Sequence, residues 1–243
     1  MNKTTKTVFV TGANKSIGFE TTRRLAAAGY HVFMGCRDLA KGEAAVATLR
    51  AEGLNNITLI EIDTSNPHSV QQAGQSLAAQ TDHLDVLINN AGILGAIPQM
   101  PSTADMAVIR QVFDTNFFGV IQTTQALMDL LRLSPSPRIV NVSSGLGSLT
   151  QHSDPSWEYY AVKNAAYGPS KTALNAYTVA LAWELRDTAF RVNTVDPGYT
   201  ATDFNNFRGP GTIPEATEVI IRFATADDVP TGKFYDRKGE IPW

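Results

Sequence analysis

Tyr167 and Lys171 are the residues whose types and spacing most clearly predict chemistry. On a helix, residues at positions i and i+4 lie on the same face, so the phenol and the ammonium group can reach a common point. A nearby cation favours the phenolate and lowers the tyrosine pKa from about 10. Such a tyrosine can give a proton to a developing alkoxide or take one from an alcohol. Because Tyr159 and Lys163 repeat the spacing, the surroundings must decide between the two pairs.

A glycine loop near the N-terminus is the second chemical signal. The β-branched and aromatic run 7–11 predicts a buried strand and residues 17–28 predict a helix, with Gly12-Ala-Asn-Lys-Ser-Ile-Gly18 between them. A strand that turns through glycines into a helix presents N–H groups and the positive end of the helix dipole, which suits a pyrophosphate. The spacing is not that of the G-x-G-x-x-G dinucleotide fingerprint.

Further motifs follow in order along the chain: Asn89-Asn-Ala-Gly92, Asn116 in Phe113–Gly119, the serine pair after Arg138–Val142, Tyr167-Gly-Pro-Ser-Lys171, and Asp196-Pro-Gly-Tyr-Thr200 with Thr202. Together with the glycine loop, these motifs span essentially the whole chain and resemble those of the short-chain dehydrogenase/reductase family. In the glycine loop, Ser16 replaces the middle glycine of the family pattern, which a serine can do provided that the backbone there does not require a positive φ. Details of the loop, of the segment after Cys36 and of the C-terminal tail resemble the carbonyl-reductase-like branch.

The resemblance implies hydride transfer between a nicotinamide cofactor and a carbonyl/alcohol pair. Reduction of a carbonyl builds negative charge on its oxygen, so the site needs a hydrogen-bond donor and a proton source. By resemblance, Ser144 orients the substrate oxygen and Tyr167 is the general acid or base. Lys171 lowers the tyrosine pKa and binds the cofactor ribose, and Asn116 holds a water that joins Lys171 to solvent.

Two choices remain open among these residues. Ser143 and Ser144 are adjacent, so on a strand they face opposite sides; the family register favours Ser144, with Ser143 as a structural hydroxyl. Tyr167 is favoured over Tyr159 because the sequence after Lys171 continues like the family's catalytic helix. Tyr159 lies in an apparent insertion within residues 144–167.

Cofactor preference is predicted from the end of the second strand, where Cys36 and Arg37 stand in place of an acidic residue. A 2′-phosphate favours a guanidinium, so Arg37 and Lys15 predict NADP(H) over NAD(H). A shift in register would instead bring Asp38 to the ribose of NAD(H). The residues expected at the cofactor are Gly12, Asn14, Lys15, Ser16, Ile17, Gly18, Arg37, Asp63 at the adenine, Asn90, Ala91, Gly92, Tyr167, Lys171, Pro197, Gly198, Thr200 and Thr202.

The elements that must position these residues alternate between strand and helix. We expect strands near 7–11, 31–36, 57–62, 84–89, 137–143, 190–196 and 233–234, and helices near 17–28, 39–52, 67–80, 103–132 and 165–187. This order predicts a single α/β domain over 1–243: a Rossmann-type, doubly wound parallel sheet of about seven strands with helices on both faces. Ligands of such sheets bind at the carboxyl ends of the strands.

Composition excludes several other classes. The 243 residues carry a net charge of −3, which gives no sign of a nucleic-acid surface. No apolar run is long enough to span a membrane, the single Cys36 suits a reducing cytoplasm, and the four scattered histidines predict no metal site.

The substrate is expected to be a small ketone, aldehyde or quinone. Residues 203–213 predict a short lid, in which Phe204 and Phe207 are either anchors or substrate contacts. Aromatic residues of the insertion, Trp157, Tyr159 and Tyr160, could complete the pocket. The alternatives are a 3-oxoacyl or hydroxysteroid reductase, and a redox sensor that binds NADP(H) without turnover. The long helices near 103–132 and 165–187 leave a homodimer or homotetramer possible.

Overall fold

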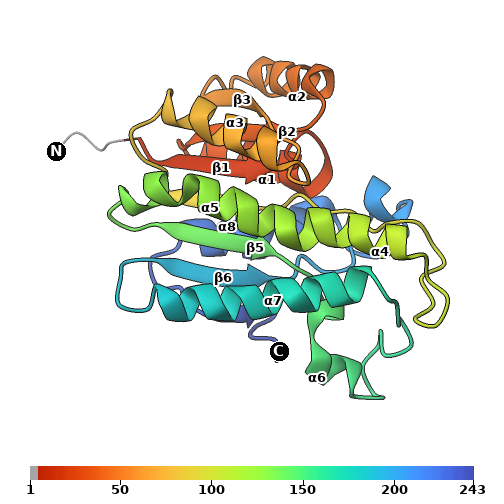
Figure 1. Ribbon diagram of the computed structural model, residues 1–243. Helices are drawn as coiled ribbons and strands as arrows, with labels where there is room; N and C mark the ends of the chain where they lie inside the picture. Colours follow the sequence, from red (N-terminus) through yellow and green to blue (C-terminus); the bar gives the residue numbers. More distant parts are fainter. Residues whose placement is uncertain (1–4) are drawn as a thin grey trace.

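A sheet of seven parallel strands forms the centre of the protein, shown in Figure 1 as a computed structural model that describes residues 5–243. The strand order is β3-β2-β1-β4-β5-β6-β7. The predicted fold class, a Rossmann-type doubly wound sheet, is therefore confirmed. The strands are β1 (Thr7–Thr11), β2 (His31–Cys36), β3 (Ile57–Glu61), β4 (Val86–Asn89), β5 (Arg138–Val142), β6 (Arg191–Val195) and β7 (Phe234–Tyr235).

Helices cover both faces of this sheet, and α3, α5 and α7 cross its front face in Figure 1. Three short turns, η1 (Asp114–Phe118), η2 (Gly145–Gly147) and η3 (Asp203–Asn205), lie between longer elements. The helices are α1 (Ser16–Ala27), α2 (Leu39–Ala51), α3 (Pro67–Ala78), α4 (Met106–Phe113), α5 (Gly119–Arg132), α6 (Leu149–His152), α7 (Tyr167–Glu184) and α8 (Ile213–Thr225).

The helices differ from the prediction in two respects. The expected helix over 103–132 is divided into α4 and α5 by η1, a π-helical turn. Helix α8 was not among the expected elements, although Thr212 and Glu215 form a capping box at its start. The remaining strands and long helices occur within a few residues of their expected positions.

The core consists of one apolar layer on each side of the sheet. One layer joins the strands to α1, α2 and α8 through residues such as Leu25, Leu49 and Phe223. The other joins them to α3, α5 and α7 through residues such as Leu77 and Leu127. Strands buried on both faces need continuous apolar runs, which explains why β1 is buried at every position.

The order in which strands are added to the sheet reverses between β1 and β4, although all strands remain parallel. Strands β2 and β3 lie on one side of β1, and β5 to β7 lie beyond β4. Ligands of doubly wound sheets bind in the crevice at this point, outside the carboxyl ends of the strands. The glycine loop follows β1 and the segment Asn89–Gly92 begins at the end of β4, so both lie at the crevice.

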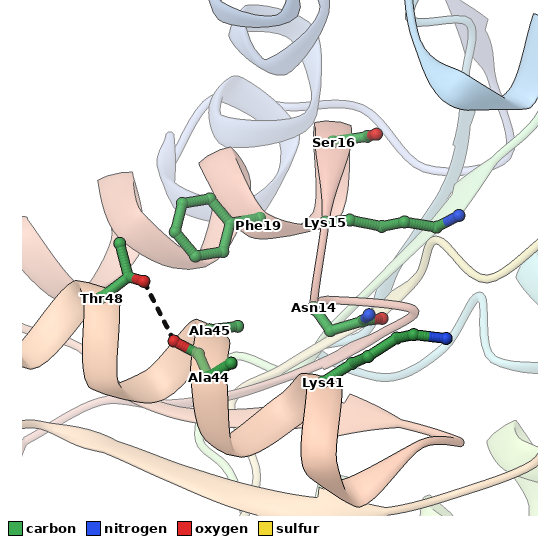
Figure 2. Close-up of a pocket in the computed structure, with 8 residues that line it drawn as sticks. All are labelled: Asn14, Lys15, Ser16, Phe19, Lys41, Ala44, Ala45 and Thr48. Atoms are coloured by element: carbon green, nitrogen blue, oxygen red, sulfur yellow. Dashed lines mark hydrogen bonds between the residues drawn. The ribbon is translucent and has the colours of Figure 1, made fainter. Parts of the chain in front are cut away.

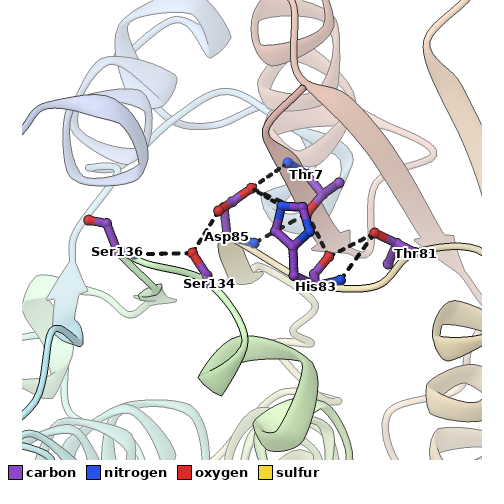
Figure 3. Close-up of polar contacts among 6 residues, drawn as sticks. All are labelled: Thr7, Thr81, His83, Asp85, Ser134 and Ser136. Carbon is purple, nitrogen blue, oxygen red and sulfur yellow. Dashed lines mark hydrogen bonds and ion pairs between the residues drawn. The ribbon is translucent and has the colours of Figure 1, made fainter. Parts of the chain in front are cut away.

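A buried carboxylate links segments at the amino ends of the strands, on the side of the sheet opposite the crevice (Figure 3). Asp85, before β4, is 7% exposed and accepts the N–H of Thr7 at 2.8 Å and the hydroxyl of Ser134 at 2.6 Å. The Nε2 atom of His83 lies 3.2 Å from the same carboxylate. Asp85 thus connects the start of β1 to the loop that follows α5.

Candidate active site

Tyr167 is the first residue of α7, and Lys171 follows one turn later on the same helix. Lys171 is buried, and its Nζ atom donates to the carbonyl of Val142, the last residue of β5, at 2.8 Å. The same atom lies 5.7 Å from the centre of the Tyr167 ring. The structure therefore brings the predicted pair together at the carboxyl edge of the sheet. Tyr159, by contrast, lies outside the helix, in the segment that precedes it.

The two adjacent serines after β5 point to different partners. Ser143 is buried, and its hydroxyl lies 3.5 Å from the main-chain carbonyl of Lys171. Ser144 lies close enough to the Tyr167 side chain to lower the pKa of the phenol, and its hydroxyl accepts the N–H of Leu146 at 3.2 Å. Of the two hydroxyls, that of Ser144 faces the phenol.

Asn116 lies in the π-helical turn η1, a kind of distortion that is frequent at functional sites. Its Oδ1 accepts the N–H of Ile93 at 2.8 Å, and its Nδ2 donates to the carbonyl of Ile93 at 2.9 Å and to the Ser170 hydroxyl at 3.1 Å. The amide thus fastens η1 to the segment after β4 and to α7. Both Nδ2 donors are used, so a water held by Asn116 would donate to the second acceptor position of Oδ1 or bind main-chain atoms.

Burial has the largest effect on the ionisation of Tyr167 and Lys171. Burial and the negative charge of Asp196 raise the pKa of Tyr167, and the hydrogen bond with Ser144 acts in the opposite direction. Burial lowers the pKa of Lys171 to about 8, although Asp196 opposes this shift. The sequence predicts that Lys171 lowers the tyrosine pKa; in the structure, burial outweighs any such effect. Tyr167 is therefore a neutral phenol at pH 7, the form that donates a proton.

Asp196 belongs to this electrostatic arrangement, although the sequence reasoning gave it no role. It follows β6, and its Oδ1 accepts the N–H of Gly198 at 2.8 Å. Its Oδ2 lies 3.1 Å from the position that a Cβ would take on Gly145, beside Ser144. Burial raises the pKa of Asp196, although the main-chain N–H groups of Gly198 and Gly145 act to lower it. Its position at the carboxyl end of a strand was the available signal.

The glycine loop departs from its prediction at Ser16. Ser16 has a φ of +51°, so the family's middle glycine is replaced at a position that does adopt the left-handed conformation. Gly12 has a φ of +63°, and unlike position 16 it must be a glycine, because a Cβ there would lie 2.9 Å from the Cα of Ala91. Gly18 is restricted likewise, since its Cβ would lie 2.4 Å from the Gly12 carbonyl.

The start of α1 suits an anion. Its N-cap residue, Lys15, makes no side-chain cap hydrogen bond to the described residues, whereas Asp38 caps α2 and Asn66 caps α3. The first-turn N–H groups of α1 therefore lack the usual side-chain acceptor and can bind a phosphate oxygen. Ile17, in this first turn, is half-buried and packs against the core.

The segment after β4 is hydrogen-bonded to the glycine loop. The side chain of Asn90 donates to the carbonyls of Thr11 at 2.9 Å and Gly12 at 3.1 Å. The main-chain N–H groups of Asn90 and Ala91 both donate to the Thr11 hydroxyl at 3.0 Å. A Cβ on Gly92 would lie 3.6 Å from Lys171 Nζ, so this segment extends from the glycine loop to the catalytic lysine.

The residues after β2 lead into α2, which forms one wall of a pocket against α1. Arg37 is exposed, whereas Asp38 caps α2 by accepting the Lys41 N–H at 3.1 Å and pairs with Lys41 Nζ at 2.9 Å. Lys41 was not among the predicted cofactor residues, although its place in the first turn after Arg37 was a signal. At the end of β3, Asp63 accepts the Ser65 hydroxyl at 2.7 Å.

Figure 2 shows this pocket, whose volume is about 430 Å³. Asn14, Lys15 and Lys41 extend toward the same side of it, so two ammonium groups lie close to the uncapped start of α1. The apolar ring of Phe19 and the side chains of Ala44 and Ala45 also line the pocket. The pocket therefore combines positive charge with an apolar wall, which suits a phosphorylated nucleoside.

The segment after β6 carries the remaining predicted cofactor residues. Gly198 has a φ of +79° directly after Pro197. The buried Thr200 pairs with Gly211 in an isolated β-bridge, which closes the lid segment at its base. Thr202, also buried, is the N-cap of η3.

Aromatic side chains lie in the segments before α7 and after β6. The Phe204 ring, in η3, is 37% exposed and its centre lies 5.5 Å from that of the Tyr167 ring, whereas Phe207 is 70% exposed. Beyond the lid, Tyr199 contacts Tyr159 with ring centres 6.0 Å apart, and Tyr159 contacts Trp157 at 5.5 Å. Of the two lid phenylalanines, only Phe204 contacts the catalytic ring among the described residues.

Within residues 5–243, no group of three or more His, Cys, Asp or Glu side chains is placed to bind a metal ion. In the same part of the chain, no helix is both long and apolar enough to cross a bilayer.

Comparisons with known proteins agree with this geometry. Residues 6–211 match the family described as short chain dehydrogenase. Salutaridine reductase of Papaver bracteatum is 30% identical, with 93% of each chain covered. (+)-Neomenthol dehydrogenase of Arabidopsis thaliana is also 30% identical, with 97% of each chain covered. A solved short chain dehydrogenase of Escherichia coli CFT073 in complex with NADPH is 26% identical, superposes with a TM-score of 0.81, and is covered over 96% of each chain. The family match spans most of the chain, so this protein belongs to the short-chain dehydrogenase/reductase family of oxidoreductases.

Proposed function

We propose that the protein is an NADP(H)-dependent carbonyl reductase that converts a ketone, aldehyde or quinone to an alcohol. The strongest support is the convergence of Ser144, Tyr167 and Lys171 at one edge of the sheet. The bound nicotinamide cofactor supplies the hydride. Ser144 orients the carbonyl oxygen, and the neutral Tyr167 phenol gives its proton to the oxygen as negative charge develops there.

The preference for NADP(H) is supported by the charges around the pocket between α1 and α2. Lys15 and Lys41 line it, and Arg37 is exposed at the end of β2. Asp38, the alternative ribose ligand, is engaged as the cap of α2 and as the partner of Lys41. A carboxylate held in this way favours a cationic site for a 2′-phosphate over a ribose site for NAD(H).

The substrate class is inferred from the side chains beside Tyr167. Phe204 packs against the tyrosine ring, and Tyr159, Tyr199 and Trp157 form a separate aromatic row. Such walls favour a flat or small apolar carbonyl compound, as expected for the carbonyl-reductase-like branch. Trp157 lies 3.3 Å from the position of a Cβ on Gly145, so the row reaches the loop that holds Ser144.

A Tyr167→Phe variant tests the proposal, and Tyr159→Phe is its matched control. We expect Tyr167→Phe to bind NADPH like the wild type but to lose about 10²- to 10⁴-fold in carbonyl reduction, because the proton donor is gone. Tyr159→Phe should retain turnover. NADPH oxidation with a panel of ketones, aldehydes and quinones measures activity, and NADPH fluorescence measures binding. Unchanged turnover in Tyr167→Phe would reject the assigned acid, and tight NADPH binding with no turnover on the panel would favour a redox sensor.

A further inference from the structure

The first residue of the lid turn η3 contacts the glycine loop from the far end of the sequence. The Asp203 carboxylate forms an ion pair with Lys15 and accepts the Ser16 hydroxyl at 2.7 Å. Partial burial of Asp203 raises its pKa, but hydrogen bonds from Lys15 and Ser16 outweigh burial, so the net pKa is lowered. Asp203 is therefore an anion at neutral pH, held against the residues expected to bind the cofactor.

Both lysines of the pocket in Figure 2 are thus paired with aspartates. Lys41 pairs with Asp38 within the first turn of α2, so this pair links nothing beyond that helix. Lys15 pairs with Asp203 across two distant segments, the glycine loop and the lid. An anion that binds Lys15 would lie beside the Asp203 carboxylate, and repulsion between two negative charges at one ammonium weakens the pair of Lys15 with Asp203.

We propose that Asp203 competes with the 2′-phosphate of NADP(H) for Lys15, so that binding of this cofactor, but not of NAD(H), releases η3 from the glycine loop. The inference rests on the NADP(H) preference proposed above. NAD(H) has a hydroxyl in place of the phosphate and offers Lys15 no competing anion. Asp203 is thereby a determinant of cofactor discrimination that lies in the substrate lid.

The release of η3 would reach the catalytic residue through the next position in the chain. Phe204 follows Asp203 in the same short turn, and its ring contacts that of Tyr167. When Asp203 leaves Lys15, η3 loses an attachment to the glycine loop, and Phe204 can move away from the phenol. The cofactor's phosphate thus controls access of the carbonyl compound to Tyr167.

Asp203→Asn tests the competition, because asparagine keeps an oxygen that can accept the Ser16 hydroxyl but removes the charge. The dissociation constants of NADPH and NADH are measured by fluorescence for wild type, Asp203→Asn, Lys15→Ala and the double variant. We expect Asp203→Asn to tighten NADPH by about two- to fivefold, the range for an exposed ion pair, and to affect NADH less. In the Lys15→Ala background the same change should have no selective effect.

Asp129→Asn is the matched control for the lost charge, since Asp129 is an exposed carboxylate paired at 3.4 Å with Arg132 near the end of α5. This variant should leave both dissociation constants unchanged. An equal effect of Asp203→Asn on the two cofactors, or weaker NADPH binding, would overturn the inference while leaving the proposed function intact. A wild type that binds NADH as tightly as NADPH would instead reject the cofactor preference and the inference with it.

Hydrogen exchange tests the release of η3 directly. Adenosine 2′,5′-bisphosphate presents the phosphate without a nicotinamide ring that could touch the lid, and 5′-AMP is its control. We expect the bisphosphate to speed exchange in residues 203–208, and 5′-AMP to leave it unchanged. Lys15→Ala should remove the difference between the two probes. Equal exchange with both probes in the wild type would contradict the release of η3.

Discussion

Two features keep the proton on Tyr167, namely its burial and the negative charge of Asp196. Burial disfavours every charged form, so it raises the pKa of the phenol and lowers that of the ammonium. Asp196 adds a negative charge that keeps Tyr167 neutral and helps to keep Lys171 protonated. The resting site therefore holds its proton on the phenol, as carbonyl reduction requires.

The pH dependence of reduction follows from the lysine. Its pKa of about 8 lies below the usual value of a lysine, so Lys171 is charged at pH 7 and loses its proton as the pH rises through about 8. We expect kcat/KM for carbonyl reduction to be constant near neutral pH and to fall tenfold per pH unit well above 8. A pH profile with one carbonyl substrate, with circular dichroism to exclude unfolding, measures this. A profile that stays flat far above pH 8 would contradict the role of the Lys171 charge.

Ser16 has a strained backbone conformation, and the strain is confined to this residue. The left-handed conformation costs a serine roughly 1–2 kcal/mol more than it costs a glycine. Its hydroxyl donates to Asp203, which offsets part of this cost. The strained position thus coincides with the contact between the glycine loop and the lid.

At the level of elements, the N–H groups at the start of a helix are available to a ligand only where no side chain accepts them. Helices α2, α3, α4 and α8 begin with a side-chain cap, and the first N–H groups of α7 are accepted by Gln99 and Asn164, whereas α1 has no side-chain cap from the described part of the chain. Helix α8 was predictable from its capping box and from Ala216, Val219, Ile220 and Phe223, whose spacing places them on one buried face. The π-helical turn η1 was not, because no residue type in Phe113–Gly119 requires the extra residue in the turn.

Asp85 stabilises the amino ends of the strands, on the side of the sheet opposite the active site. Asp85→Ala would leave the buried N–H of Thr7 and the Ser134 hydroxyl without their acceptor. We expect a loss of about 2–4 kcal/mol in the free energy of unfolding, because unsatisfied buried polar groups are costly. Denaturant unfolding measures the change, and Asp129→Ala, at an exposed carboxylate, is the control. A loss no larger than that of the control, or a reduced kcat/KM in the folded variant, would contradict this structural role.

For the whole molecule, exposed apolar side chains on α7 and η1 favour self-association. Trp183 is 67% exposed, and Val179, one turn earlier, and Phe118 are also exposed. Val179 and Trp183 lie on the same face of α7, and an exposed apolar patch of this kind is typical of an interface. We expect a homodimer or homotetramer that Trp183→Ser weakens and that Leu133→Ser, equally exposed at the end of α5, does not. Light scattering after size exclusion measures this, and a monomeric wild type, or equal effects of both variants, would contradict it.

The alternation of buried strands and helices, and hence the doubly wound sheet, could be predicted from the sequence because apolar periodicity and glycine turns act locally. The spacing of Tyr167 and Lys171 likewise predicted that the two residues lie one turn apart on a helix. The other features of the site depend on the tertiary fold. The orientation of Ser144, the electrostatic effect of Asp196 and the pairing of Lys15 with Asp203 join segments far apart in the chain. Such contacts depend on how the strands are ordered and how deeply each group is buried, and neither is encoded in the spacing of the residues.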